Sequence, residues 1–115
     1  YAYAAPYRTR PAYRYTLENS VYVAPWARQR GVGLALLRAL LSGCEIWGAR
    51  QMVAIVGDPA ANNASIRLHE KAGFRSVGTL VGVGRKFDSW LDSLMLQRPL
   101  GHGISTSPGH PRVPA

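Results

Sequence analysis

The sequence is short of cysteine, of acidic residues and of long apolar runs. Cys44 is the only cysteine among 115 residues, so no disulfide can form within the chain, and a reducing cytoplasm is the expected location. No apolar run approaches the about 18 residues that a membrane span needs, and there is no cleavable signal pattern. We therefore expect a cytoplasmic protein without a membrane partner.

Acidic residues are outnumbered. The chain has 14 lysines and arginines against 6 acidic residues, a formal charge of +8. Such an excess suits an anionic partner, either nucleic acid or a phosphorylated cofactor. The arginines are scattered among apolar residues instead of clustered, which disfavours nucleic acid.

The length allows one domain, and 47% hydrophobic residues exclude a disordered chain. Strand-like and helix-like stretches alternate, and residues after Gly101 lack periodicity. We expect a domain over 1–100 and a flexible tail over 101–115. The expected strands cover 1–5, 15–23, 51–56, 74–84 and 90–98, the helices cover about 32–47 and 64–72, and 6–14 and 85–89 are a loop and a turn.

The middle of the chain predicts an α/β fold. A strand, an apolar-striped helix and the buried-type strand Met52–Val56 follow one another, and this order implies a parallel strand pair. Cys44 lies on the apolar stripe of the helix, where we expect it to be a core residue. Gly48 and Gly73 are the expected helix ends, and Asn62 or Asn63 can cap the second helix.

A glycine-containing turn opens the first helix. It has the form Arg-x-x-Gly-x-Gly, which can wrap a pyrophosphate in main-chain amides while arginine adds a charged contact. A plain turn into a core helix is the alternative. The pattern is neither a Walker loop nor a complete dinucleotide fingerprint. The residues of this turn are Arg28, Gln29, Arg30, Gly31, Val32, Gly33 and Leu34.

A second cluster follows the second strand of the pair: Asn62-x-x-Ser65-x-x-Leu68-His69-Glu70-Lys71-x-Gly73-Phe74. Together with the first motif it resembles the GNAT family, the GCN5-related N-acetyltransferases. Within that family, the residues around Glu18, His69 and Arg85 look like the phosphinothricin or methionine-sulfone acetyltransferase branch. The likeness covers roughly residues 1–100 and not the tail.

The resemblance implies the GNAT fold, a mixed central sheet flanked by helices. It also implies acetyl-CoA as co-substrate, no metal, and direct attack of a small amino-acid-like amine on the thioester, without an acyl-enzyme. The chain opens in a strand-like stretch at Tyr1, so we expect the first strands and helices of the domain to be absent.

Glu18 is the residue that the resemblance offers as general base, with an exposed strand glutamate as the alternative. Main-chain groups of Val21, Tyr22 and Val23 would pair with the pantetheine arm like an added strand, as well as forming core strand. His69 stands where most relatives have the tyrosine credited with protonating the leaving thiolate; a packing or surface histidine is the alternative.

Two further polar residues complete the expected cofactor site. Asn62 would hydrogen-bond the pantetheine, and Ser65 would reach the cofactor as well; helix capping is the alternative for both.

The acceptor site is expected in the loop before Glu18. Arg8, Arg10 and Tyr13 would line it, since arginine suits a carboxylate or phosphinate, and a solvated basic loop is the alternative. Lys86 and Trp90 of the last hairpin would close the pocket, with Trp90 as a core residue in the alternative. His102 and His110 lie in the tail and make no metal site.

Two other functions stay open at this point. One is a non-catalytic CoA-binding remnant, because a sheet without its first strands exposes an apolar edge and face. The other is a basic nucleic-acid-binding module. The branch that the sequence resembles is often dimeric, which makes a second copy of the chain a candidate partner beside the small amine.

Overall fold

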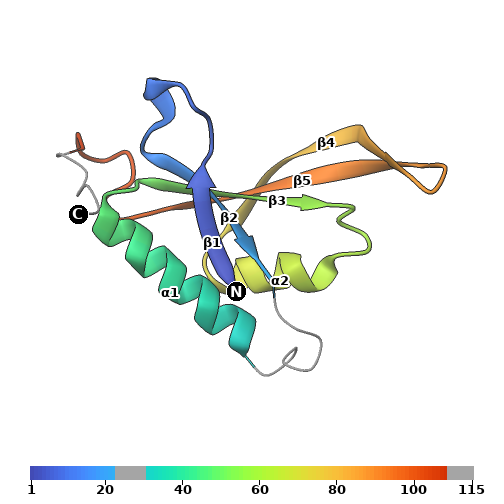
Figure 1. Ribbon diagram of the computed structural model, residues 1–115, viewed down its shortest axis with the longest axis horizontal. Coiled ribbons are helices and arrows are strands. Elements are labelled where there is room, and N and C mark those ends of the chain that lie inside the picture. Colours follow the sequence, from blue (N-terminus) through green and yellow to red (C-terminus); the bar gives the residue numbers. More distant parts are fainter. Residues whose placement is uncertain (23–30, 109–115) are drawn as a thin grey trace.

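The structure is a computed structural model that describes residues 1–22 and 31–108. Strands and helices follow the order expected from the sequence, with a short 3-10 turn inside the first loop (Figure 1). The elements are β1 Ala2–Pro6, η1 Pro11–Tyr13, β2 Thr16–Val21, α1 Val32–Trp47, β3 Gln51–Gly57, α2 Asn63–Lys71, β4 Arg75–Lys86 and β5 Ser89–Pro99.

The five strands form one mixed sheet in the order β1-β2-β3-β5-β4. β2 and β3 run parallel, as the strand–helix–strand pattern predicts, and the other neighbours are antiparallel. β4 and β5 form a long hairpin that extends away from the helices (Figure 1). The expected mixed sheet with helices is therefore confirmed.

A glycine flanks α1 at each end. Gly31 precedes it with φ +75° and Gly48 follows it with φ +112°, a left-handed conformation that glycine adopts without a Cβ clash. The amide of Gly48 donates to the carbonyls of Cys44 and Glu45, which closes the last turn. The predicted bounds of this helix are therefore confirmed. They could be predicted because both glycines directly adjoin the helix in the sequence.

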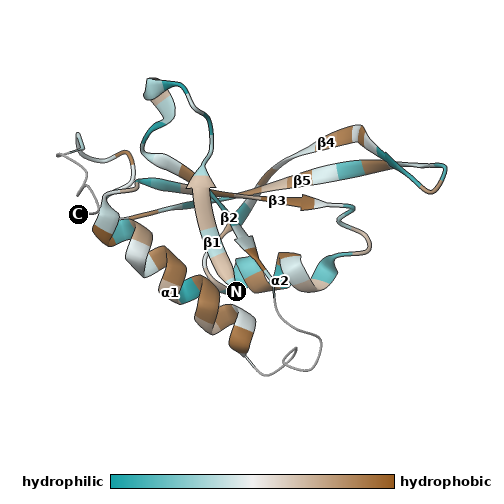
Figure 2. Cartoon of the chain, in the orientation of Figure 1, coloured by the Kyte–Doolittle hydropathy of each residue, from teal (hydrophilic) through white to brown (hydrophobic). Residues whose placement is uncertain are grey.

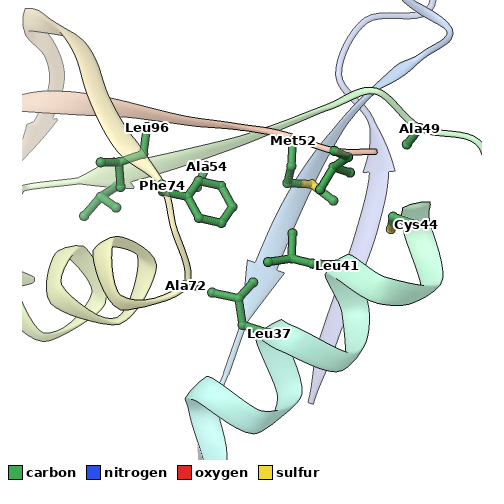
Figure 3. Close-up of a cluster of buried hydrophobic side chains, with 11 residues drawn as sticks. Leu37, Leu41, Cys44, Ala49, Met52, Ala54, Ala72, Phe74 and Leu96 are labelled. Atoms are coloured by element: carbon green, nitrogen blue, oxygen red, sulfur yellow. The ribbon is translucent and has the colours of Figure 1, made fainter. Parts of the chain in front are cut away.

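The core lies on one face of the sheet. Both helices cover this face (Figure 1). Apolar residues recur along α1 (Figure 2), and those buried in the core are Leu37, Leu41 and Cys44. Leu37 and Leu41 point from α1 toward Met52 of β3, and Phe74 fills the space near Leu96 (Figure 3). Burial of each such side chain stabilises the fold by roughly 1.5–3 kcal/mol.

The opposite face of the sheet is less covered. Along β3, Met52, Ala54 and Val56 are buried against the helices, whereas Val53 is half-buried and Ile55 is 44% exposed. This alternation follows the two-residue period of a strand. The continuous apolar run had suggested a strand buried on both faces, but β3 is buried on one face only, because no described element packs on the other.

Cys44 lies in the core, as expected. Burial raises the pKa of its thiol, so the reactive thiolate is disfavoured.

The segment after β5 is hydrogen-bonded to Arg50, the residue before β3. Nη1 of Arg50 donates to the carbonyls of Gly103 (2.7 Å) and Thr106 (3.2 Å). Nη2 donates to Oγ1 of Thr106 (2.9 Å) and to the carbonyl of Ser107 (3.1 Å). Leu100 is fully buried just before these contacts. Residues 103–107 are therefore held to Arg50, while the division into domain and tail stays a prediction.

Candidate active site

The parallel strands β2 and β3 separate after a short paired stretch. Their register consists of Thr16 with Gln51, Leu17 with Met52 and Glu18 with Val53. β2 nevertheless continues to Val21 and β3 to Gly57. Beyond Glu18, the edge of β2 that faces β3 therefore has backbone groups without a ladder partner in the described chain. We call this opening the fork; an extended ligand can add to it as a strand does.

The predicted pantetheine-binding strand lies at the fork. Val21 is the last residue of β2 and packs against the core, and Tyr22 follows it with 48% exposure. Val23, the third member of this predicted set, lies outside the described residues.

The start of α1 lies beyond the end of β2. The first helical hydrogen bond described there runs from Ala35 N to Gly31 O, at 3.0 Å. The amides of Val32, Gly33 and Leu34 precede it and have no partner within the helix, as at any helix N-terminus. Gly31 leaves open space where a side chain would stand. These features fit an anion. Arg28, Gln29 and Arg30 lie outside the described residues.

Glu18 is the last residue of β2 that pairs with β3, and it is half-buried. Its neighbours Leu17 and Val21 pack against the core, and Asn19 contacts α2. Because side chains alternate along a strand, Glu18 lies on the opposite face, the one without helices. A carboxylate there is accessible to a ligand that enters the fork.

A shallow groove of about 230 Å³ lies on that same open face. Tyr7, Thr16 and Val53 contribute to its lining. Thr16 precedes Glu18 by two residues on β2, and Val53 is the register partner of Glu18. Glu18 itself does not line the groove, but these two residues place the groove on the same face as Glu18, next to the paired part of β2 and β3.

Asn62 does not cap α2 with its side chain. Its Nδ2 instead donates to the carbonyls of Gly57 (2.8 Å) and Asp58 (3.1 Å), so the side chain closes the turn after β3. Oδ1 has no hydrogen bond among the described residues and is available as an acceptor. Ser65 is half-buried in the first turn of α2, and its carbonyl accepts a hydrogen bond from His69.

His69 is buried, with 4% of its surface exposed. Nδ1 is 2.7 Å from the carbonyl of Ser65, and Nε2 is 3.0 Å from Nδ2 of Asn19. Burial lowers the pKa of His69, and the hydrogen bond to Ser65 partly opposes this shift. The ring therefore links α2 to β2; a catalytic role stays a prediction.

Sequence reasoning missed Asn19. It is 6% exposed and is the polar member of the inward-facing set Leu17, Asn19 and Val21. The two-residue alternation of inward- and outward-facing positions along β2 could have identified Asn19, because a polar side chain at a core position of a strand needs a hydrogen-bond partner.

The predicted acceptor residues fall into two groups. Nη1 of Arg8 donates to the carbonyl of Tyr7, and its guanidinium lies 4.2 Å above the Tyr7 ring, whose edge contacts Tyr13. Arg10 is exposed beside them and precedes η1. This loop therefore adjoins the groove through Tyr7.

Lys86 belongs to the second group and ends β4 at the tip of the hairpin, far from η1 (Figure 1). The two groups could share one substrate only across two copies of the chain. Trp90 is 69% exposed beneath Arg85, so the core alternative for Trp90 was wrong.

A larger hollow of about 410 Å³ lies between α1, α2 and β5. Arg38, Glu45, Lys71 and Arg98 contribute to its lining, and no predicted site residue does. This second hollow is therefore separate from the predicted site residues that the structure describes.

Comparison with known proteins decides the family. The model of the acetyltransferase (GNAT) family matches residues 1–74, which contain β1, β2, the fork, α1, β3 and α2. The chain belongs to the GNAT family. The GNAT fold is shared with a phosphinothricin acetyltransferase of Sinorhizobium meliloti solved in complex with AcCoA, at a TM-score of 0.88 and 44% identity over 94% of this chain and 57% of that one.

Curated GNAT relatives carry related names. A phosphinothricin N-acetyltransferase of Alcaligenes faecalis is 51% identical over 94% of this chain and 54% of its own length. An L-methionine sulfoximine/L-methionine sulfone acetyltransferase of Salmonella typhimurium is 40% identical over 87% of this chain and 57% of its own. The chain thus spans about half the length of the curated relatives it matches, and the expected likeness to this branch is confirmed.

Within the described residues, no group of three or more histidine, cysteine or acidic side chains is arranged to hold a metal ion. None of the helices in that part of the chain has the length and hydropathy to cross a bilayer.

Proposed function

We propose that the chain binds acetyl-CoA at the fork and transfers its acetyl group to the amine of a small amino-acid-like molecule. The observation that carries this proposal is the fork itself: β2 offers unpaired backbone groups directly after Glu18. The AcCoA complex of the Sinorhizobium relative supports the choice of ligand.

The residues at the fork fit acetyl-CoA. Backbone groups of Val21 and Tyr22 would hold the pantetheine arm, and Asn62 would accept a hydrogen bond from it through Oδ1. The free amides of Val32 to Leu34 would hold the pyrophosphate. We propose contacts for Val23, Arg28, Gln29, Arg30 and Ser65 as well, on the resemblance of the motifs.

Acetyl-CoA supplies a thioester carbon that a neutral amine can attack. Glu18 would remove the proton that the amine must lose, directly or through water. A main-chain amide of β2 beyond Glu18 would donate to the thioester oxygen as negative charge develops there. His69 is the proposed source of the proton for the departing thiolate, and solvent is the alternative.

The names of the relatives suggest the acceptor class, amino acids of the phosphinothricin, methionine sulfoximine or methionine sulfone type. Such molecules carry a carboxylate, with which Arg8 and Arg10 would pair, since their loop adjoins the groove through Tyr7. Tyr13 completes the proposed acceptor set, in a cytoplasmic enzyme. Lys86, at the tip of the β4–β5 hairpin, would contribute to it from a second copy of the chain.

Ligand-dependent thermal unfolding tests the binding step. At acetyl-CoA concentrations about 100 times Kd, the native state gains about 2.7 kcal/mol, which raises Tm by roughly 10 °C in a domain of this size. An unchanged Tm would reject acetyl-CoA as the ligand of this chain.

Glu18→Gln tests the chemical step. We expect it to keep the Tm rise and to lose at least about 100-fold in acetyl transfer to phosphinothricin. Glu70→Gln is the matched control, because Glu70 is exposed on α2. If wild-type chain shows the Tm rise without acetyl transfer, it is a CoA-binding unit and not an enzyme.

A further inference from the structure

Asn19 and His69 form a buried pair whose hydrogen atoms can be assigned. The carbonyl of Ser65 can only accept, so Nδ1 of His69 carries the proton in the 2.7 Å bond between them. Nε2 of the neutral ring is then an acceptor, and Nδ2 of Asn19 donates to it at 3.0 Å. Burial lowers the pKa of His69, which favours this neutral form.

Oδ1 of Asn19 is the unusual atom. It is buried and has no hydrogen-bond partner in the described part of the chain. Buried carbonyl oxygens are nearly always paired, so an orphaned one needs an explanation. Turning the amide over by 180° exchanges Oδ1 and Nδ2. Oδ1 would then face Nε2 and could accept a hydrogen bond from Nε2–H of a protonated ring.

The ring itself is less free to move. It packs against Phe74 in a T-shaped contact, with ring centroids 4.9 Å apart and an angle of 83°. Nδ1 is held within the same helix by Ser65, four residues earlier. The amide of Asn19 is therefore the part of the pair that can adapt to a change of protonation.

The pair lies at the fork. Asn19 directly follows Glu18, the last residue of β2 that pairs with β3. Nearby charged side chains are half-buried or exposed, and none is hydrogen-bonded to the ring among the described residues. They are Glu18, Arg38, Glu70, Lys71 and Arg75.

We propose that Asn19 is a positioning residue for His69: it donates to Nε2 of the tautomer that Ser65 fixes and, by turning its amide over, lets Nε2 take up and release a proton without losing its hydrogen bond. The use of this proton in acetyl transfer rests on the proposed function. There Glu18 takes the proton that the amine loses, and Nε2–H of a His69 ring that has first taken up a proton from solvent gives one to the CoA thiolate. Release of the Glu18 proton to solvent returns both groups to their starting states, so no net proton is gained or lost.

Imidazole ¹⁵N NMR of the chain tests the assignment without any ligand. The chain has three histidines, and the His69 signals are those lost in His69→Asn. We expect a protonated Nδ1 and an unprotonated Nε2 in the wild type. Asn19→Asp should raise the pKa of His69 by about one unit or more, because a carboxylate favours Nε2–H. Asn19→Leu should lower it, because Nε2–H of the protonated ring then has no acceptor, while Ser65 keeps the Nδ1–H tautomer. The His102 signals are the internal control.

Two NMR results would overturn the proposal. One is an unprotonated Nδ1 in the wild type. The other is a His69 with the same tautomer and titration in Asn19→Asp and Asn19→Leu as in the wild type. Neither depends on acetyl-CoA, so failure of the proposed function would leave this test intact.

Kinetics test the consequence for acetyl transfer. Asn19→Leu should lower kcat about tenfold or more and change the KM for acetyl-CoA much less, since the pair would act on proton transfer and not on cofactor binding. A wild-type kcat in the Asn19→Leu variant would exclude Asn19 from the reaction. Ser42→Ala, on the exposed side of α1, should leave kcat unchanged.

Discussion

Gly73 lies against the side chain of Arg98, so closely that a Cβ atom on Gly73 would be 3.0 Å from Nε of Arg98. The φ angle of Gly73 is +94°, in the region that L-residues rarely adopt. Arg98 in turn lies 3.4 Å from Glu45 of α1. The turn after α2 is thus tied through β5 to α1.

Gly73→Ala should therefore destabilise the chain. The left-handed conformation alone costs a non-glycine residue about 1–2 kcal/mol, and displacement of Arg98 adds to it. Gly43→Ala is the matched control, since Gly43 lies inside α1 with open space around its Cβ position. That change should stabilise by about 0.5–1 kcal/mol. Urea unfolding of both variants measures the difference, and equal effects would contradict the prediction.

Asn62→Ala should weaken both the fold and cofactor binding. The variant loses two hydrogen bonds to the turn after β3, worth about 1 kcal/mol each. It also loses the proposed acceptor for pantetheine, so we expect Kd for acetyl-CoA to rise about tenfold, or 1.4 kcal/mol. Asn63→Ala makes the same change at the next residue, whose exposed side chain forms no described hydrogen bond. Calorimetric titration that finds equal Kd values for the two variants would remove Asn62 from the site.

The stability of the chain should fall as the pH drops below about 6.5, the usual pKa of histidine in an unfolded chain. The pKa of His69 is lowered in the folded state, so the unfolded state binds the proton first. The free energy of unfolding then decreases with falling pH until it passes the folded pKa. Urea unfolding between pH 5 and about pH 7.5 measures this slope. His69→Leu should flatten it and His102→Asn should not; an unchanged slope in His69→Leu would be inconsistent with a buried neutral ring.

The β4–β5 hairpin carries a turn that its residues do not favour. Phe87 has φ +49° and Asp88 has φ +61°, although neither is glycine. Positive φ at both central residues is typical of a type I′ turn, which prefers Asn-Gly. The double change Phe87→Asn, Asp88→Gly should stabilise by about 1 kcal/mol, measured by chemical unfolding. Phe87→Ala alone keeps the unfavourable φ and should bring no gain.

Much of this architecture could be predicted because its signals are local. Gly48, Gly73 and the apolar stripe of α1 mark helix bounds within a few residues of the chain. The position of β5 between β3 and β4 could not be predicted, since a hairpin pattern does not say which of its strands meets the rest of the sheet.

Tertiary contacts also decided the environment of single residues. Trp90 reads as a core residue by type but lies on an extended hairpin, beneath Arg85. At the site, Glu18 and Asn62 could be named from motifs. The Asn19–His69 bond joins residues on β2 and α2, and only the folded chain shows it.

The short β2–β3 register has a consequence for cooperativity. β3 lies between two antiparallel pairs, β1–β2 and β4–β5, and joins them into one sheet. Seven register pairs join it to β5 and three join it to β2. Units held by fewer contacts open at lower free energy, so amide hydrogen exchange should separate β1 and β2 from the rest of the sheet. Glu18 is the last residue of the short β2–β3 pairing, so opening of this strand pair would displace the proposed general base.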